Sequence, residues 1–262
     1  MNSFKSSKNK SSSNDGASSG AGEVVYECGT ADMAGELCKG AEKEQLAPQT
    51  RGDSAGPSRV DLSFQSFVMK YLMKETFGAG KDIDTLDVRM AMKMTCKKCL
   101  ASGLTFLARC DGRIVGARLT CIWQRGDKPD SVDGLWNEDF IVGLLFLAEL
   151  EKDKERLLPA DVVKVANYEG VTVHPDFRRR GIAQRLNELT LAKARELRLQ
   201  GITVSATSPK SQALFTKMGF QTLNELKATG SYVDSKGATV EAVADEHNAE
   251  YGKFMFLPLT QE

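Results

Sequence analysis

The sequence lacks an excess of charge of either sign, and it also lacks a long hydrophobic run. Its 35 lysines and arginines balance 35 aspartates and glutamates. This balance argues against a general nucleic-acid or membrane-surface binder, so any anion site must be local. The longest apolar stretch, residues 140–148, is far too short to cross a bilayer. We therefore expect neither nucleic acid nor a membrane among the partners, and the sequence leaves the oligomeric state open.

Cysteine and histidine are also scarce. The chain has 6 cysteines and 2 histidines, and no signal-peptide pattern precedes the cysteines. We therefore expect reduced thiols in a cytoplasmic protein instead of a disulfide framework. Cys96 and Cys99 form a Cys-x-x-Cys pair, but it lies in a helical pattern without a second pair or a histidine cluster. We expect no metal site.

The sequence does contain enough apolar material for a globular core. A hydrophobic content of 41% in 262 residues suits one large domain or two small ones. Residues 1–22 have almost nothing to bury, and we expect a disordered tail there. Residues 23–58 hold a possible strand over 24–28 and a possible helix over 33–45, and whether they belong to the fold stays open. The main domain is expected over 59–262.

Alternating and helical apolar patterns predict the elements of this domain. The expected helices cover residues 64–77, 84–100, 138–155, 186–199 and 208–218. Asp84 is the expected N-cap of the second of these helices. The expected strands cover an antiparallel hairpin over 104–123, then 162–173, 201–206, 222–233 and 251–257. Runs of apolar residues at helical spacing are interpreted as core packing.

The stretch 171–187 has the most specific pattern. It begins as an alternating strand, breaks at His174-Pro175 and restarts as a helix at Gly181. Between Arg178 and Ala183 it follows the pattern Arg-x-x-Gly-x-Ala, in which the glycine lets the backbone approach a ligand closely. Free amides at a helix N-terminus suit a pyrophosphate. The neighbouring arginines suit a phosphate-rich partner such as coenzyme A.

Two blocks in this order resemble the GNAT N-acetyltransferase superfamily. The first, Arg178 to Ala183 after a strand, is similar to the acyl-CoA motif Gln/Arg-x-x-Gly-x-Gly/Ala. The second, Ala213-Leu-Phe-Thr-Lys-Met-Gly-Phe220, is similar to Ala-Leu-Tyr/Phe-x-Lys-x-Gly-Phe. The inserted helix over 138–155 and the polar loop before the last strand resemble the arylalkylamine N-acetyltransferase-like branch. The resemblance covers residues 59–259 and implies an α+β fold (an α/β three-layer arrangement), with a mixed, mostly antiparallel sheet flanked by helices.

The resemblance also implies acetyl-CoA as co-substrate and assigns residues to it. Backbone amides from Arg179 to Gln184 would hold the pyrophosphate, and the strand edge at Val171 and Val173 would pair with the pantetheine arm. The amide of Val173, or one beside it, would polarise the thioester carbonyl. The full expected cofactor set is Val171, Thr172, Val173, Arg178, Arg179, Arg180, Gly181, Ile182, Ala183, Gln184, Ser211 and Phe215.

A general base is the next requirement of amine acetylation. Glu169 is our first candidate, because its spacing places it on the face of Val171 and Val173 unless a bulge intervenes. The arylalkylamine branch often uses a Glu-Pro-Leu motif after the first long helix. We assign residues 80–84 to that motif, which is degraded here. Asp82 and Asp84 could stand in for its carboxylate, or serve as a solvated loop charge and a helix cap.

The proton donor is also open. Phe215 stands where many superfamily members have Tyr, and it has no proton to give. The hydroxyls just before the short helix belong to Thr207, Ser208 and Ser211, and we name Ser208 and Ser211 as catalytic candidates. Ser208 also suits an N-cap. His174 and His247 are weaker candidates for a proton relay.

The leading hypothesis is an acetyl-CoA-dependent N-acetyltransferase acting on a small primary amine, with an arylalkylamine such as a biogenic monoamine as the first choice. A polyamine and a protein or peptide amine are the alternative substrates. Because the Glu-Pro-Leu motif and the tyrosine are missing, a non-catalytic acyl-CoA-binding module is the alternative of a different class.

Overall fold

The computed structural model describes residues 23–29, 64–77, 82–128, 132–233, 239–242 and 250–260. The expected tail over 1–22, the possible helix over 33–45 and His247 lie outside these residues. Within the described ranges, no helix has both the length and the apolar composition needed to cross a membrane.

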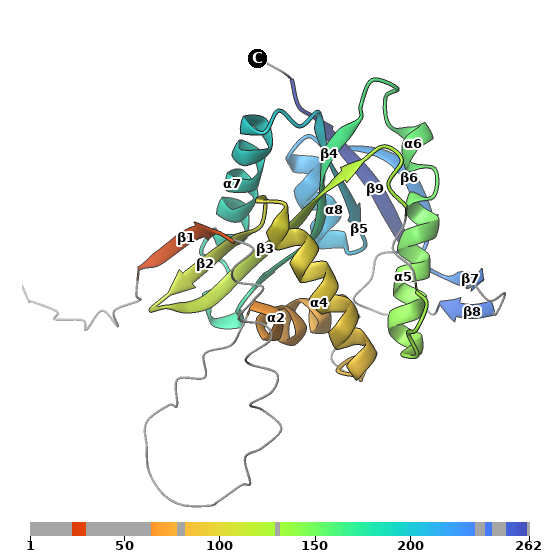
Figure 1. Cartoon of the computed structure of the whole chain (residues 1–262), viewed down its shortest axis with the longest axis horizontal. Coiled ribbons are helices and arrows are strands. Elements are labelled where there is room, and N and C mark those ends of the chain that lie inside the picture. Colours follow the sequence, from red (N-terminus) through yellow and green to blue (C-terminus); the bar gives the residue numbers. More distant parts are fainter. Residues whose placement is uncertain are drawn as a thin grey trace, which may run out of the picture.

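A seven-stranded sheet with the order β1-β2-β3-β4-β5-β9-β6 forms the centre of the fold (Figure 1). Its strands are β1 (Val24–Cys28), β2 (Phe106–Cys110), β3 (Arg113–Gln124), β4 (Lys164–Val173), β5 (Gly201–Ala206), β6 (Gln221–Lys227) and β9 (Tyr251–Pro258). The β4–β5 pair is parallel, and the other neighbours in this sheet are antiparallel. The expected mixed, mostly antiparallel α+β fold is confirmed. Because β1 pairs with β2 along its whole length, residues 24–28 belong to the sheet.

Helices cover both faces of the sheet (Figure 1). One face carries a continuous helix made of α2 (Phe64–Phe67), η1 (Val68–Met73) and α3 (Lys74–Phe77), followed by α4 (Leu86–Ala101), α5 (Glu138–Glu151) and α6 (Lys154–Leu157). The other face carries α7 (Ile182–Glu196) and α8 (Pro209–Lys217), and the turn η2 (Pro175–Phe177) leads from β4 to α7. The two faces therefore present different surroundings to the side chains that alternate along β3 and β4.

Three predictions about the elements were wrong. The expected strand over 222–233 divides, because the chain leaves the main sheet after β6 and forms β7 (Gly230–Val233), which pairs with β8 (Thr239–Ala242). The expected helix over 138–155 is interrupted between α5 and α6. Asp84 does not cap α4, since Thr85 holds the N-cap position and the Asp84 carboxylate binds Arg89 instead.

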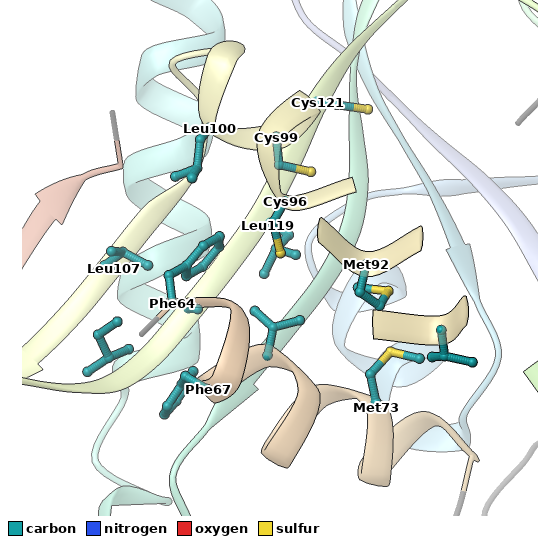
Figure 2. Close-up of a cluster of buried hydrophobic side chains, with 14 of the residues drawn as sticks. Phe64, Phe67, Met73, Met92, Cys96, Cys99, Leu100, Leu107, Leu119 and Cys121 are labelled. Carbon is teal, nitrogen blue, oxygen red and sulfur yellow. The ribbon is translucent and has the colours of Figure 1, made fainter. Parts of the chain in front are cut away.

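The core on the α4 face explains the Cys-x-x-Cys pair. Figure 2 shows the side chains of Cys96 and Cys99 among those of Phe64, Met92 and other apolar residues, between α4 and the sheet. Both cysteines are fully buried, and burial raises the pKa of Cys96 to about 12. Thiols held protonated in this way are structural and poorly reactive.

β4 and β5 separate soon after they meet. Their pairing is confined to residues 166–168 of β4 and 202–204 of β5, while β4 runs on to Val173. We call this the β4–β5 divergence. Beyond Tyr168, the edge of β4 that faces away from β3 is therefore not paired with a strand of the described chain.

β4 also contains a bulge. Leu119 of β3 is opposite Gly170, and the next residue, Thr120, is opposite Tyr168, so Glu169 is an extra residue without a partner on β3. A residue added in this way interrupts the alternation of side chains between the two faces. The position of Glu169 in the site depends on this bulge.

Candidate active site

The N-terminus of α7 has the geometry of an anion site. Gly181 is its N-cap, with φ 75°, and in the described part of the chain no side-chain hydrogen bond caps it. Arg179 also has a positive φ, 60°. A Cβ placed on Gly181 would meet no atom within 4 Å, so the first-turn amides, which have no acceptor within the helix, face open space. The residues present fit a diphosphate held by backbone amides and the helix dipole.

The three arginines before this helix differ in their contacts. Arg178 forms an ion pair with Glu75 of α3, and its Nε also donates to the Val173 carbonyl at 3.2 Å. The Arg180 guanidinium lies 4.8 Å from the centre of the Phe177 ring. All three arginines are exposed, so they add positive charge around the helix terminus, while Arg178 also ties the loop to α3.

The free edge of β4 agrees with the expected place of the pantetheine arm. The His174 amide donates to the Val115 carbonyl of β3 at 2.8 Å. Because hydrogen-bonding directions alternate along a strand, Val171 and Val173 direct their amides away from β3 and toward the β4–β5 divergence. Thr172 instead directs its amide to β3, and its hydroxyl donates to Glu75 Oε2 at 3.0 Å on the α3 face. Thr172 therefore does not present its amide at the free edge, and its expected place in the cofactor set stays a prediction.

Glu169 does not share the face of Val171 and Val173, because the bulge intervenes. Its carboxylate oxygen Oε1 accepts hydrogen bonds from Cys121 Sγ at 3.0 Å and from Asn167 Nδ2 at 2.9 Å. Both partners belong to the face that α4 and α5 cover, whereas Val173 packs against the first turns of α7. The side chains of Glu169 and Val173 thus lie on opposite faces of one strand, and the free backbone edge of β4 runs between these two faces.

A buried network fixes the orientation of Asn167 beside Glu169. Asn167 Oδ1 accepts from Lys154 Nζ and from Thr203 Oγ1, both at 2.8 Å. With two donors on Oδ1, the amide nitrogen must face Glu169. Lys154 is only 7% exposed and also binds Glu151 Oε2 at 2.8 Å. The inserted α5–α6 segment therefore determines how Glu169 is held.

Glu169 opens onto a groove of about 1160 Å³. Its apolar and aromatic lining comprises Cys121, Ile122, Trp123, Leu144, Leu145, Leu147, Ala148, Leu226 and Tyr232. The charged side chains of α5 and α6 along the groove are neutralised in part by ion pairs within the groove, such as those of Glu149 with Lys152 and Asp153 with Arg156. The groove can therefore hold an apolar or aromatic body and place an attached amine near the Glu169 carboxylate.

The hydroxyl candidates serve a structural purpose. Ser208 is the N-cap of α8, and its Oγ accepts from the Ser211 amide, while Ser211 Oγ accepts from the Ser208 amide at 3.2 Å. The expected N-cap is confirmed, and these hydroxyls are engaged in a capping box. Phe215 is 2% exposed and packs against Tyr168 and Phe220, so its side chain belongs to the core.

The remaining candidates lie apart from Glu169. His174 packs against the rings of Tyr71 and Phe177 at the end of β4. The Asp84 carboxylate is bound to Arg89, and Asp82 is an exposed loop residue whose carbonyl accepts from Asn137. Neither aspartate is bound to a residue of β4.

Sequence reasoning missed Glu75. Its carboxylate reaches the end of β4, where it binds Thr172 and Arg178. The available signal was its position as a carboxylate at the end of the first long helix. Our assignment of the Glu-Pro-Leu motif to residues 80–84, just after Glu75, stays a prediction.

Comparisons with known proteins agree with this geometry. Residues 97–220 match the acetyltransferase (GNAT) family. A comparison with curated protein sequences gave no significant match.

Solved structures share the fold over most of the chain. A mutant of agmatine N-acetyltransferase in its apo form is 19% identical with a TM-score of 0.65, covering 90% of this chain and 99% of that one. The Drosophila melanogaster polyamine N-acetyltransferase is 18% identical with a TM-score of 0.63, covering 90% and 100%. Arylalkylamine N-acetyltransferase 2 from Aedes aegypti is 17% identical with a TM-score of 0.62, covering 90% and 99%.

The helix-terminal anion site, the diverging β4 and β5, and the family match converge on one assignment. Residues 97–220 carry an acetyltransferase (GNAT) family domain, and N-acetyltransferases of this family take acetyl-CoA as their co-substrate.

Proposed function

We propose that the protein transfers the acetyl group of acetyl-CoA to the primary amine of a small arylalkylamine. The observation that carries this proposal is the groove beside Glu169, which combines leucine side chains of α5 with the rings of Trp123 and Tyr232. An aromatic or aliphatic body packs against such a lining. The Glu169 carboxylate, which is part of the same lining, meets the amine.

The chain supplies cofactor binding through its backbone. The α7 amides from Ile182 to Gln184 hold the diphosphate, with the exposed arginines around them. The outward-facing amides of Val171 and Val173 hold the pantetheine arm, and the Val173 amide is placed to polarise a carbonyl at the strand edge.

Glu169 is the proposed base. In the described part of the chain its Oε1 is held by Cys121 and Asn167, and no hydrogen bond reaches its Oε2. That oxygen is available to accept a proton from the amine, directly or through one water. Glu75 is the second carboxylate near β4, but Thr172 and Arg178 engage both of its oxygens.

The test is initial-rate release of free coenzyme A thiol with arylalkylamines, polyamines including agmatine, and a basic peptide. Glu169→Gln should lower kcat by about 10² to 10⁴ for the preferred amine. Glu225→Gln is the matched control, because Glu225 forms an exposed pair with Lys253 on β9. Glu75→Gln compares the second carboxylate directly.

The outcomes separate the alternatives. Turnover confined to arylalkylamines and lost in Glu169→Gln supports both the substrate class and the base. Preference for a polyamine or the peptide overturns the substrate class, and loss of turnover in Glu75→Gln alone overturns the base. Coenzyme A binding without turnover of any amine in the panel would favour the non-catalytic module.

A further inference from the structure

Four buried polar side chains on the α7 face of the sheet have atoms without hydrogen-bond partners. Within the described chain these are Arg118 Nε and Nη2, Thr120 Oγ1, Tyr168 OH, and both amide atoms of Asn187. Buried polar groups in folded proteins are nearly always satisfied, so each exception requires an explanation. The exception of greatest consequence is Arg118, which is only 1% exposed.

Arg118 reaches beneath β4 to the β4–β5 divergence. It starts on β3, opposite Val171. Its guanidinium carbon lies 3.4 Å from the centre of the Tyr168 ring and 5.8 Å from that of Phe215 on α8. Because α8 packs against β5, a side chain from β3 that approaches Phe215 must cross under β4.

Tyr168 lies at the same point. It is the last residue of β4 that pairs with β5, opposite Val204. Its ring contacts the Arg118 guanidinium and the rings of Phe215 and Phe220. A buried cation and a buried phenol, both with unused donors, thus meet where the free edge of β4 begins.

The electrostatics favour an anion at this place. Burial lowers the pKa of Arg118 to about 10, so the side chain still carries its charge at neutral pH. In the described chain no carboxylate forms an ion pair with it, although the charge of Glu169 acts on Arg118 from the opposite face of β4 and raises its pKa slightly against the effect of burial. A buried cation without an acceptor is costly, and an anion brought beside it recovers part of that cost.

We propose that Arg118 and Tyr168 form the site that receives the sulfur of coenzyme A as a thiolate. This inference rests on the proposed function. Glu169 first takes one proton from the ammonium and passes it to water in the open groove. When the amine nitrogen then forms its bond to the acetyl carbon and the C–S bond breaks, the electron pair stays on sulfur and the second proton of the nitrogen goes to Glu169. Arg118 holds positive charge beside that sulfur, and the Tyr168 hydroxyl donates a hydrogen bond to it. Phe215 provides no donor for this task.

The test compares coenzyme A with desulfo-coenzyme A, which lacks the sulfur, by isothermal titration calorimetry near pH 7.5. Buffers of different protonation enthalpy report protons released on binding. The unmodified protein should bind coenzyme A about tenfold more tightly than the desulfo analogue, which at pH 7.5 corresponds to a thiol pKa lowered by about two units, and should release protons with coenzyme A alone. Arg118→Met should lose this preference while keeping its affinity for desulfo-coenzyme A.

Two further variants make the result specific. Tyr168→Phe removes one unpaired oxygen and should reduce the preference. Thr120→Val removes a neighbouring unpaired hydroxyl and should leave the preference unchanged. Thermal unfolding checks that each variant folds, and if Arg118→Met does not fold, Tyr168→Phe carries the test.

Several results would overturn the proposal. Equal affinity of the unmodified protein for the two ligands would show that the sulfur has no site here. If Arg118→Met loses affinity for both ligands equally, or if Thr120→Val loses the preference for coenzyme A, these buried side chains have a general packing role. If Tyr168→Phe keeps the full preference for coenzyme A, Tyr168 is not part of the site. Binding of neither ligand by the unmodified protein would overturn the proposed function as well.

Discussion

Replacing Asp87 with Asn should weaken the attachment of the inserted helix α5 to the rest of the fold. Asp87 lies in the first turn of α4 and is 3% exposed. Its Oδ2 accepts hydrogen bonds from the amides of Trp136 at 2.8 Å and Asn137 at 2.9 Å, and its Oδ1 accepts from the Thr85 hydroxyl. One carboxylate therefore fastens α4 to the segment that starts α5, which forms a wall of the substrate groove.

The pKa of Asp87 gives the magnitude. Burial alone would raise this pKa, but the hydrogen bonds from Thr85, Trp136 and Asn137 outweigh burial and lower it from 3.8 to about 2. A shift of this size corresponds to about 2 kcal/mol of stability. An asparagine has one acceptor oxygen, so its NH₂ group must oppose at least one of these donors. We expect Asp87→Asn to lower the free energy of unfolding by about 2 kcal/mol at pH 7.

The assay is urea unfolding of both proteins between pH 7 and pH 2. Because the folded-state pKa is depressed, the contribution of Asp87 is fully present above pH 4 and disappears as pH falls toward 2. The stability difference between the proteins should therefore shrink over that interval. Asp84→Asn is the matched control, since Asp84 forms an exposed pair with Arg89 worth at most about 1 kcal/mol. A difference that stays constant down to pH 2 would refute the reasoning.

Three further changes test other parts of the site. Gly181→Trp should abolish coenzyme A binding by calorimetry, with a small loss of stability from the positive φ; undiminished affinity would contradict the anion site. Asn167→Leu should lower kcat about tenfold to a hundredfold, because Glu169 loses its orienting donor; an unchanged kcat would argue against this positioning. Gly252→Ala should destabilise the protein by about 1–3 kcal/mol in thermal unfolding, since the new Cβ would lie 2.5 Å from the Phe146 ring. An unchanged Tm would show that α5 shifts to accommodate the methyl group.

Patterns among residues close together in the sequence were sufficient to predict most of the fold. Alternation and helical periodicity predicted the strands and helices around the site, and the Arg-x-x-Gly-x-Ala pattern predicted the helix terminus at Gly181. These features depend on residues close together in sequence. The break between β6 and β7 was missed because both segments have strand composition, and only their different partners distinguish them.

The side chains of the site were harder to predict because their positions depend on distant contacts. The spacing of Glu169 predicted one face, but the register between β3 and β4 places it on the other. Glu75 approaches Thr172 from 97 residues away. Arg118 lies in a strand whose composition gave no sign that its charge would be buried against Tyr168.

The extra residue in β4 has a consequence for how such a site can be altered. On either side of Glu169 the side chains of β4 keep a regular alternation, with Tyr168 toward α8 and Gly170 toward Leu72 of η1. A strand shortened by that one residue would keep every other side chain on its present face. The carboxylate is thus separable from the strand that carries it, so an acidic group can be added or removed here while the free edge of β4 stays in register.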